Sequence, residues 1–156
     1  MTGCLTDARD LTQRLDDAVV RLVPSVAALL ERLSSSGELV TRTEHRIQIL
    51  TVPLRFPDGI GRGSIVARVF RYRTSVRVDL EIVHNRVLAN AAGVPSQRPC
   101  FLNDFVTSVA LGPEAEALPP EFVRQVLTGV RNATAAVESH NKRHPEPWGQ
   151  VRVVAV

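Results

Sequence analysis

The sequence predicts an α+β domain with an N-terminal helix, an antiparallel sheet of about five strands, a C-terminal helix and room for one last strand. Apolar residues recur every three or four positions near both ends of the chain and every second position in the middle. The chain has 156 residues, of which 44% are hydrophobic and 22% charged, a composition typical of globular proteins. Because this length is short for two domains, we expect one domain over residues 1–156.

The first helix is expected to run to residue 33, because the apolar side chains from residue 11 onward form one stripe of a helix. The stripe consists of Leu11, Leu15, Ala18, Leu22, Val26, Leu29 and Leu33. Pro24 interrupts it, since proline lacks the amide hydrogen of the helical ladder and its ring crowds the preceding turn. We expect either a kink near Pro24 or two shorter helices that meet there. Residues 1–6 are expected to be loose.

The sheet is expected to start with one bulged strand. Polar and apolar residues alternate over residues 41–56, with a change of phase at Ile49 and Leu50 that is typical of a β-bulge. Pro53 cannot donate a hydrogen bond to the ladder, which places this end of the strand at an edge or a bend. The glycine-rich residues 57–63 then indicate a hairpin turn.

The next two strands are expected at residues 64–73 and 75–83. The second has the clearest alternation in the chain, with apolar side chains on one face and charged or hydroxyl side chains on the other. No Asn-Gly or Asp-Gly pair marks the turn between the strands, so the register is open. With residues 74–75 as the loop, Arg68 lies opposite Glu81.

The remaining elements are a short strand at 86–92, a loop at 93–99, a strand within 101–111 that closes the sheet, a helix from about 120 to 140, irregular residues 144–150 and a last strand within 151–156. The order of elements resembles type III secretion chaperone-like folds and some small strand-annealing proteins. This resemblance concerns the fold alone, because no motif connects the sequence to either group.

The composition indicates a cytoplasmic protein with no membrane partner. No run of about 18 apolar residues occurs, and the first twenty residues mix acidic and basic side chains where a signal peptide would be apolar. Cys4 and Cys100 could form at most one disulfide, which is no disulfide framework. Free thiols are typical of a reducing compartment.

Positive charge is concentrated in the middle of the chain. The net charge is +3, and residues 41–100 contain ten Arg against four acidic residues, while the regions before and after are slightly acidic. A field of this sign attracts either phosphate groups or an acidic protein surface, and does not distinguish between them.

No catalytic, metal-binding or cofactor-binding site is predicted. His140 and His144 have the spacing of a zinc-binding pair, but Pro145 follows directly and basic residues commonly gather at a helix C-terminus. Cys100 and His84 could meet in the fold, yet neither lies in a motif that would activate a nucleophile. We interpret them as a packed thiol and a turn residue.

The candidate binding residues are Arg68, Phe70, Arg71, Tyr72, Arg73 and Arg77. In the expected register, Phe70 and Tyr72 share a face with Arg77. Aromatic rings between guanidinium groups can stack bases and neutralise the phosphates of a single strand. The same side chains can instead pack in a core, or form a surface that contacts a protein.

These observations favour a non-catalytic binding or adaptor module. The first interpretation is a chaperone-like protein that binds a protein partner, with a symmetric homodimer through the sheet or through the N-terminal helix. The second is a single-stranded nucleic-acid-binding protein that uses the Arg-rich strands. The third, a small enzyme or ligand carrier, lacks a nameable acid/base pair.

Overall fold

The computed structural model describes two helices and eight strands over residues 3–34, 38–55, 62–83, 85–89, 95–96, 106–143 and 151–154. The helices are α1 (Gly3–Leu33) and α2 (Pro120–Arg143). The strands are β1 (Val40–Glu44), β2 (Ile47–Arg55), β3 (Arg62–Tyr72), β4 (Ser75–Val83), β5 (Asn85–Ala89), β6 (Pro95–Ser96), β7 (Val106–Leu111) and β8 (Val151–Val154). The predicted α+β fold is confirmed.

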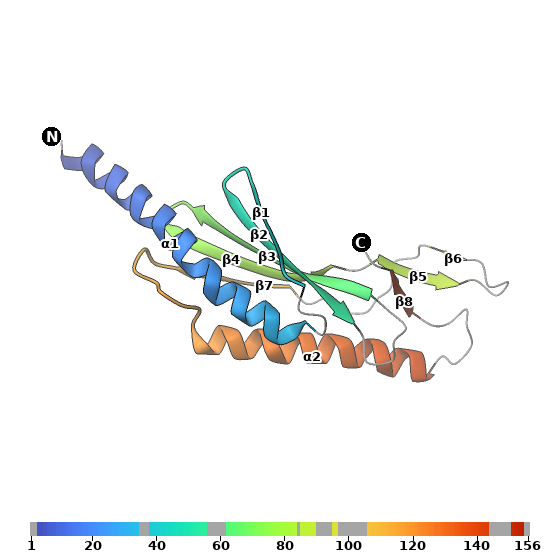
Figure 1. The fold of residues 1–156 in the computed structure, drawn as a ribbon. Coiled ribbons are helices and arrows are strands. Elements are labelled where there is room, and N and C mark those ends of the chain that lie inside the picture. The colour runs from blue at the N-terminus through green and yellow to red at the C-terminus, as the bar shows by residue number, and fades with distance from the viewer. Residues whose placement is uncertain are drawn as a thin grey trace.

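The main sheet has five antiparallel strands in the order β1-β2-β3-β4-β7, and β6, β5 and β8 form a second, smaller sheet. Figure 1 shows α1 crossing the main sheet, with α2 beside it. No helix within the described residues is both long and apolar enough to cross a membrane.

The core lies between the two helices and one face of the main sheet. The predicted stripe of α1 is confirmed, because Leu15, Leu22 and Val26 are buried against the sheet. α2 contributes Phe122 and Val126 to the same core. The sheet contributes Leu50, Val52, Ile65, Ala67, Val69, Val76, Val78, Leu80 and Ile82. Burial of these apolar side chains is the main force that holds helices and sheet together.

α1 passes through Pro24 as one helix, so the alternative of two shorter helices is wrong. Pro24 and Val20 both lie on the exposed side of the helix, where water can bond to the carbonyl oxygen that Pro24 leaves without a donor. Leu22 and Val26, on either side of Pro24 in the sequence, are fully buried. Their packing fixes both halves of the helix on the sheet.

The expected bulged strand over residues 41–56 is instead a hairpin, with β1 and β2 joined at His45 and Arg46. Both residues have positive φ, 48° and 66°, as the two central residues of a type I′ turn require. Such turns usually contain Asn or Gly, so neither side chain signals this one.

The change of phase at Ile49 and Leu50 is not a bulge. The two residues pair with consecutive residues of β1, Arg42 and Thr41, in an unbroken register. They therefore point to opposite faces of the sheet, and both are buried. Each face of β2 thus has an apolar residue at this level.

β3 and β4 are confirmed as a hairpin, but its turn is at Arg73 and Thr74, one residue earlier than expected. Arg68 consequently lies opposite Asp79 rather than Glu81. Because this register differs from the expected one by two residues, every side chain stays on its expected face.

The other strands follow the prediction with two differences. β5 does not join the main sheet, and the short strand β6 lies in the region expected to be a loop. α1 already starts at Gly3, so residues 3–6 of the terminus expected to be loose are helical. Several of the residues considered above lie outside the described part of the chain: residues 57–61, His84, Cys100 and residues 144–150, which include His144.

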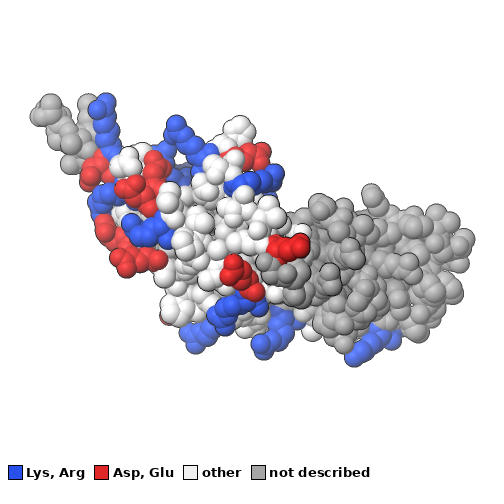
Figure 2. All heavy atoms as spheres, viewed as in Figure 1, with Lys and Arg blue, Asp and Glu red and all other residues white. Residues whose placement is uncertain are grey.

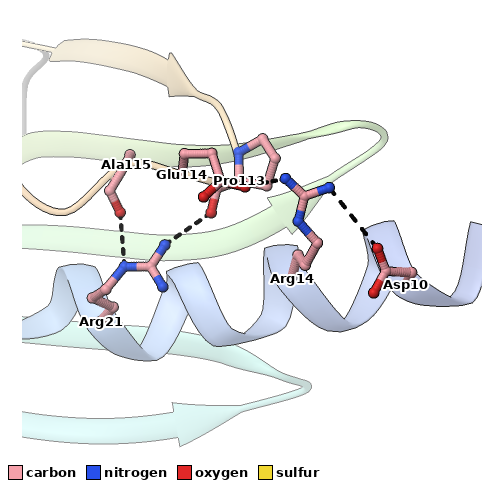
Figure 3. A network of polar contacts seen from close by, with 6 residues as sticks. All are labelled: Asp10, Arg14, Arg21, Pro113, Glu114 and Ala115. Carbon is pink, nitrogen blue, oxygen red and sulfur yellow. Dashed lines mark hydrogen bonds and ion pairs between the residues drawn. The ribbon is translucent and has the colours of Figure 1, made fainter. Parts of the chain in front are cut away.

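The connection between β7 and α2 is bound to the exposed side of α1 (Figure 3). Arg21 donates hydrogen bonds to two carbonyl oxygens of this connection, that of Ala115 at 3.0 Å and that of Pro113 at 2.8 Å. Arg14, about two helical turns earlier, forms an ion pair and a hydrogen bond with Glu114. These contacts hold α1 to the segment that leads into α2.

Acid is expected to remove the contribution of the Arg14–Glu114 pair. The hydrogen bond from Arg14, and then its charge, hold the pKa of the Glu114 carboxyl below its usual value of 4.5. A carboxyl with a lowered pKa stabilises the folded state above its unfolded pKa, and this contribution is lost as pH falls through the folded pKa. Glu114→Gln should therefore lower the melting temperature slightly at pH 7 and have no effect well below pH 4.5.

The matched control is Glu116→Gln, which removes a likewise exposed carboxylate two residues away that has no described partner. The melting temperatures of the wild type, Glu114→Gln and Glu116→Gln are measured by circular dichroism from pH 7 to pH 3 and compared. If the two variants have the same pH profile, the ion pair does not stabilise the connection.

Candidate interaction face

The candidate binding residues lie around the face of the main sheet that is turned away from α1 and α2, here called the outer face. Alternation along β3 and β4 places Arg68, Phe70 and Tyr72 on this face together with Arg77 and Asp79. β2 adds Ile47 and Ile49, β4 adds Glu81, β7 adds Val106, Ser108 and Ala110, and β1 adds Val40, Arg42 and Glu44. The expectation that Phe70 and Tyr72 share a face with Arg77 is therefore correct.

Arg71 does not belong to the outer face. It pairs with Val76, a core residue, and its Nε lies 3.4 Å from a carboxylate oxygen of Asp16 on α1. The ion pair therefore connects the end of β3 to the helix side of the sheet. The six candidate residues therefore do not form one common surface, because residues 68 and 71 differ by an odd number of positions on one strand.

Three Arg residues of the outer face have side chains that the structure describes, Arg42, Arg68 and Arg77, and each has a carboxylate partner on the same face. Arg68 donates a hydrogen bond of 2.7 Å to Glu81, diagonally across the β3–β4 pair. Arg77 donates one of 2.7 Å to Asp79, two residues along β4. Arg42 lies 3.7 Å from Glu44 on β1. The positive charge that the sequence concentrates in the middle of the chain is thus balanced at these three Arg residues.

The hydrogen bond from Arg77 to Asp79, followed by the charge of the carboxylate, raises the pKa of the Arg77 guanidinium further above its usual value. Arg77 is therefore charged at neutral pH. The partner carboxylate occupies one side of the guanidinium, which leaves less of it available for a phosphate group.

An aromatic cluster is located where β3 ends. The rings of Phe70 and Tyr72 meet edge to face, with centroids 6.4 Å apart and planes at 80°. The guanidinium carbons of Arg73 and Arg77 lie 5.3 and 5.7 Å from the centroid of the Tyr72 ring. Contacts of this kind are favourable, because the ring face is electronegative. Tyr72 is still 44% exposed.

Arg73 differs from the other candidate Arg residues. It occupies the β3–β4 turn with a positive φ of 55° and is exposed. No carboxylate among the described residues pairs with it. Of the two guanidinium groups in the aromatic cluster, that of Arg73 is therefore the one that is available to an acidic group of a partner.

Two shallow grooves lie next to each other along β7, each with a volume of about 340 Å³. The first, the Tyr72 groove, is lined by Tyr72, Arg73, Thr74, Ser75, Arg77, Ser108, Val109 and Ala110. The second, the Glu81 groove, is lined by Arg68, Arg77, Asp79, Leu80, Glu81, Val106, Thr107 and Ser108. They meet at Arg77 and Ser108. The small side chains of β7 leave this space beside the long side chains of β3 and β4.

A larger groove of about 640 Å³ lies between α1 and the β1–β2 turn. Val20 and Phe70 are among its apolar residues, and Arg46 and the Arg71–Asp16 pair are among its polar ones. No group of three or more His, Cys, Asp or Glu side chains that could hold a metal occurs in the part of the chain that the structure describes.

On the side of the molecule that shows the helices, acidic and basic side chains are likewise intermixed near the start of α1 (Figure 2). No family model, curated protein or solved structure was found to match the chain.

Proposed function

We propose that the protein is a non-catalytic protein-binding module, or adaptor, that binds its partner on the outer face of the main sheet. The observation that carries this proposal is the internal pairing of Arg42, Arg68 and Arg77 with carboxylates of the same face. Because these three guanidinium groups are already neutralised by carboxylates, they offer little net positive charge to a polyanion, whereas the aromatic residues and Arg of the face are residue types enriched at protein interfaces.

Exposed apolar side chains on this face support the proposal. Val106 is 65% exposed, Val40 60% and Tyr72 44%, and Ile47 and Phe70 on the same face are half-buried. Tyr and Arg are the residue types that most often dominate binding energy at protein interfaces. A second copy of this chain is one protein that could cover such a face, since a symmetric pair is the commonest assembly.

Site-specific photocrosslinking tests the proposal. A benzophenone amino acid is placed at Tyr72 or at Val106 and, as control, at exposed Arg131 on α2, in cells of the organism that carries the gene. We expect protein adducts from the two outer-face positions and none from position 131. An adduct of twice the chain's mass would identify a second copy, and another mass a different partner. Equal labelling at all three positions would contradict the proposal.

Binding of single-stranded nucleic acid is the second candidate, favoured by Arg73 and the exposed ring of Tyr72. It has less support, because Arg68, Arg71 and Arg77 all have carboxylate partners. Two guanidinium groups and the Phe70 ring also contact the Tyr72 ring, where a base would have to stack.

Fluorescence anisotropy with a labelled single-stranded oligonucleotide at two salt concentrations separates the candidates. A steep loss of binding as salt rises is the sign of released counterions. We expect the wild type to show no oligonucleotide binding with this salt dependence. The double variant Tyr72→Ala/Arg73→Ala and the single variant Arg71→Ala are titrated beside the wild type. Salt-sensitive binding that only the double variant loses would favour nucleic acid over protein.

A further inference from the structure

The outermost strand β7 lacks the features that normally protect a sheet edge. Among the described residues no strand pairs with its second side, and its six residues, Val106–Leu111, include no charge, proline or glycine. The opposite outermost strand, β1, carries exposed Arg42 and Glu44. Natural sheets usually place charges, prolines or bulges on an edge, because an unprotected edge is a template for another strand.

The grooves beside β7 are located where an added strand would need them. A strand that pairs with β7 directs every second side chain to the outer face. The side chains of Ser108 and Ala110 are small, so such side chains could lean over β7 into the Tyr72 groove and the Glu81 groove. In recognition by strand addition, backbone hydrogen bonds give affinity and pockets for alternate side chains give specificity.

The charges of the two grooves differ. In the Glu81 groove, both Arg68 and Arg77 have carboxylate partners, so this groove is balanced. In the Tyr72 groove, Arg73 has no carboxylate partner among the described residues, and only its contact with the Tyr72 ring is seen. An acidic side chain therefore fits the Tyr72 groove, and an uncharged one fits the Glu81 groove.

We propose that β7 takes up an extended segment of a partner protein as a sixth strand, with an Asp or Glu side chain beside Arg73 and an uncharged side chain in the Glu81 groove. This inference rests on the proposed protein-binding function and names the kind of segment bound. A second copy of β7 is not the occupant, because its outer-face residues, Val106, Ser108 and Ala110, include no carboxylate.

A random peptide library displayed on phage is selected against the whole protein, and the strongest selected peptide is synthesised for anisotropy titrations. We expect alternating apolar residues with an acidic residue at one position. Replacing that acid by its amide should weaken binding about 1.5- to fivefold, the range of an exposed ion pair. Methylating two backbone nitrogens that face β7 should weaken binding about tenfold or more, because two hydrogen bonds are lost.

Two protein variants complete the test. Arg73→Asn removes the guanidinium but keeps a residue that tolerates positive φ. Arg46→Asn is the matched control, because Arg46 is exposed, has a φ of 66° and occupies the turn of the other hairpin. We expect only Arg73→Asn to lose the preference for the acidic peptide over its amide.

Three results would overturn the inference: no enriched peptide, binding unaffected by backbone methylation, or equal behaviour of the two variants. None of these contradicts the protein-binding function if photocrosslinks form at Tyr72 and Val106. If those crosslinks are also absent, the proposed function fails as well.

Discussion

Replacing Leu22 by Ala is expected to lower the free energy of unfolding by about 2–5 kcal/mol, the range for truncating a buried leucine. Leu22 lies in the middle of α1, is fully buried and belongs to the core shared by both helices and the sheet. The loss combines the transfer free energy of the removed methyl groups with the cost of the cavity left behind. Urea denaturation followed by circular dichroism measures it.

The matched control for Leu22→Ala is Val20→Ala on the same helix. Val20 is 67% exposed, so its truncation should change the free energy of unfolding by no more than about 0.5 kcal/mol. Equal effects of the two substitutions would show that α1 does not pack on the sheet through the stripe that contains Leu22.

The elements that the sequence predicts well are those with a long, regular pattern. α1, α2 and the β3–β4 hairpin each show one period over nine or more residues, and each lies within a few residues of its expected range. In these segments burial and local preference agree, so periodicity alone identifies both the element and its inward face.

The β1–β2 hairpin could not be predicted from its residues. A two-residue turn interrupts the alternation by so little that two short strands read as one strand with a change of phase. The residues of the turn, His45 and Arg46, carry no glycine or asparagine signal. Packing of the hairpin in the fold therefore determines a conformation that local preference does not favour.

For the candidate site, the sequence predicts the face of most residues and misses their partners. The period of two already separates Arg71 from Phe70 and Tyr72, so its position on the helix side could have been derived. Its partner Asp16 could not, because that contact depends on where α1 crosses the sheet. The grooves beside Ser108 likewise depend on the pairing of β7 with β4, strands far apart in the sequence.

Replacing Ile49 by Ala is expected to lower the free energy of unfolding by about 2–4 kcal/mol, although Ile49 lies on the outer face. Its side chain is only 6% exposed and does not belong to the core under the helices. In the register of the sheet it lies between Arg42 and Arg68, whose long stems can cover it while their charged ends meet Glu44 and Glu81.

Val40→Ala provides the control for Ile49→Ala, because Val40 is on the same face and 60% exposed, and its truncation should cost no more than about 0.5 kcal/mol. A loss below about 1 kcal/mol for Ile49→Ala would mean that this part of the face is open to solvent. A large loss has a consequence for binding. Because the centre of the outer face is then already closed by its own ion pairs, a partner finds accessible apolar surface at the margins of this face, at Tyr72 and Val106 and, on the opposite edge strand, at Val40.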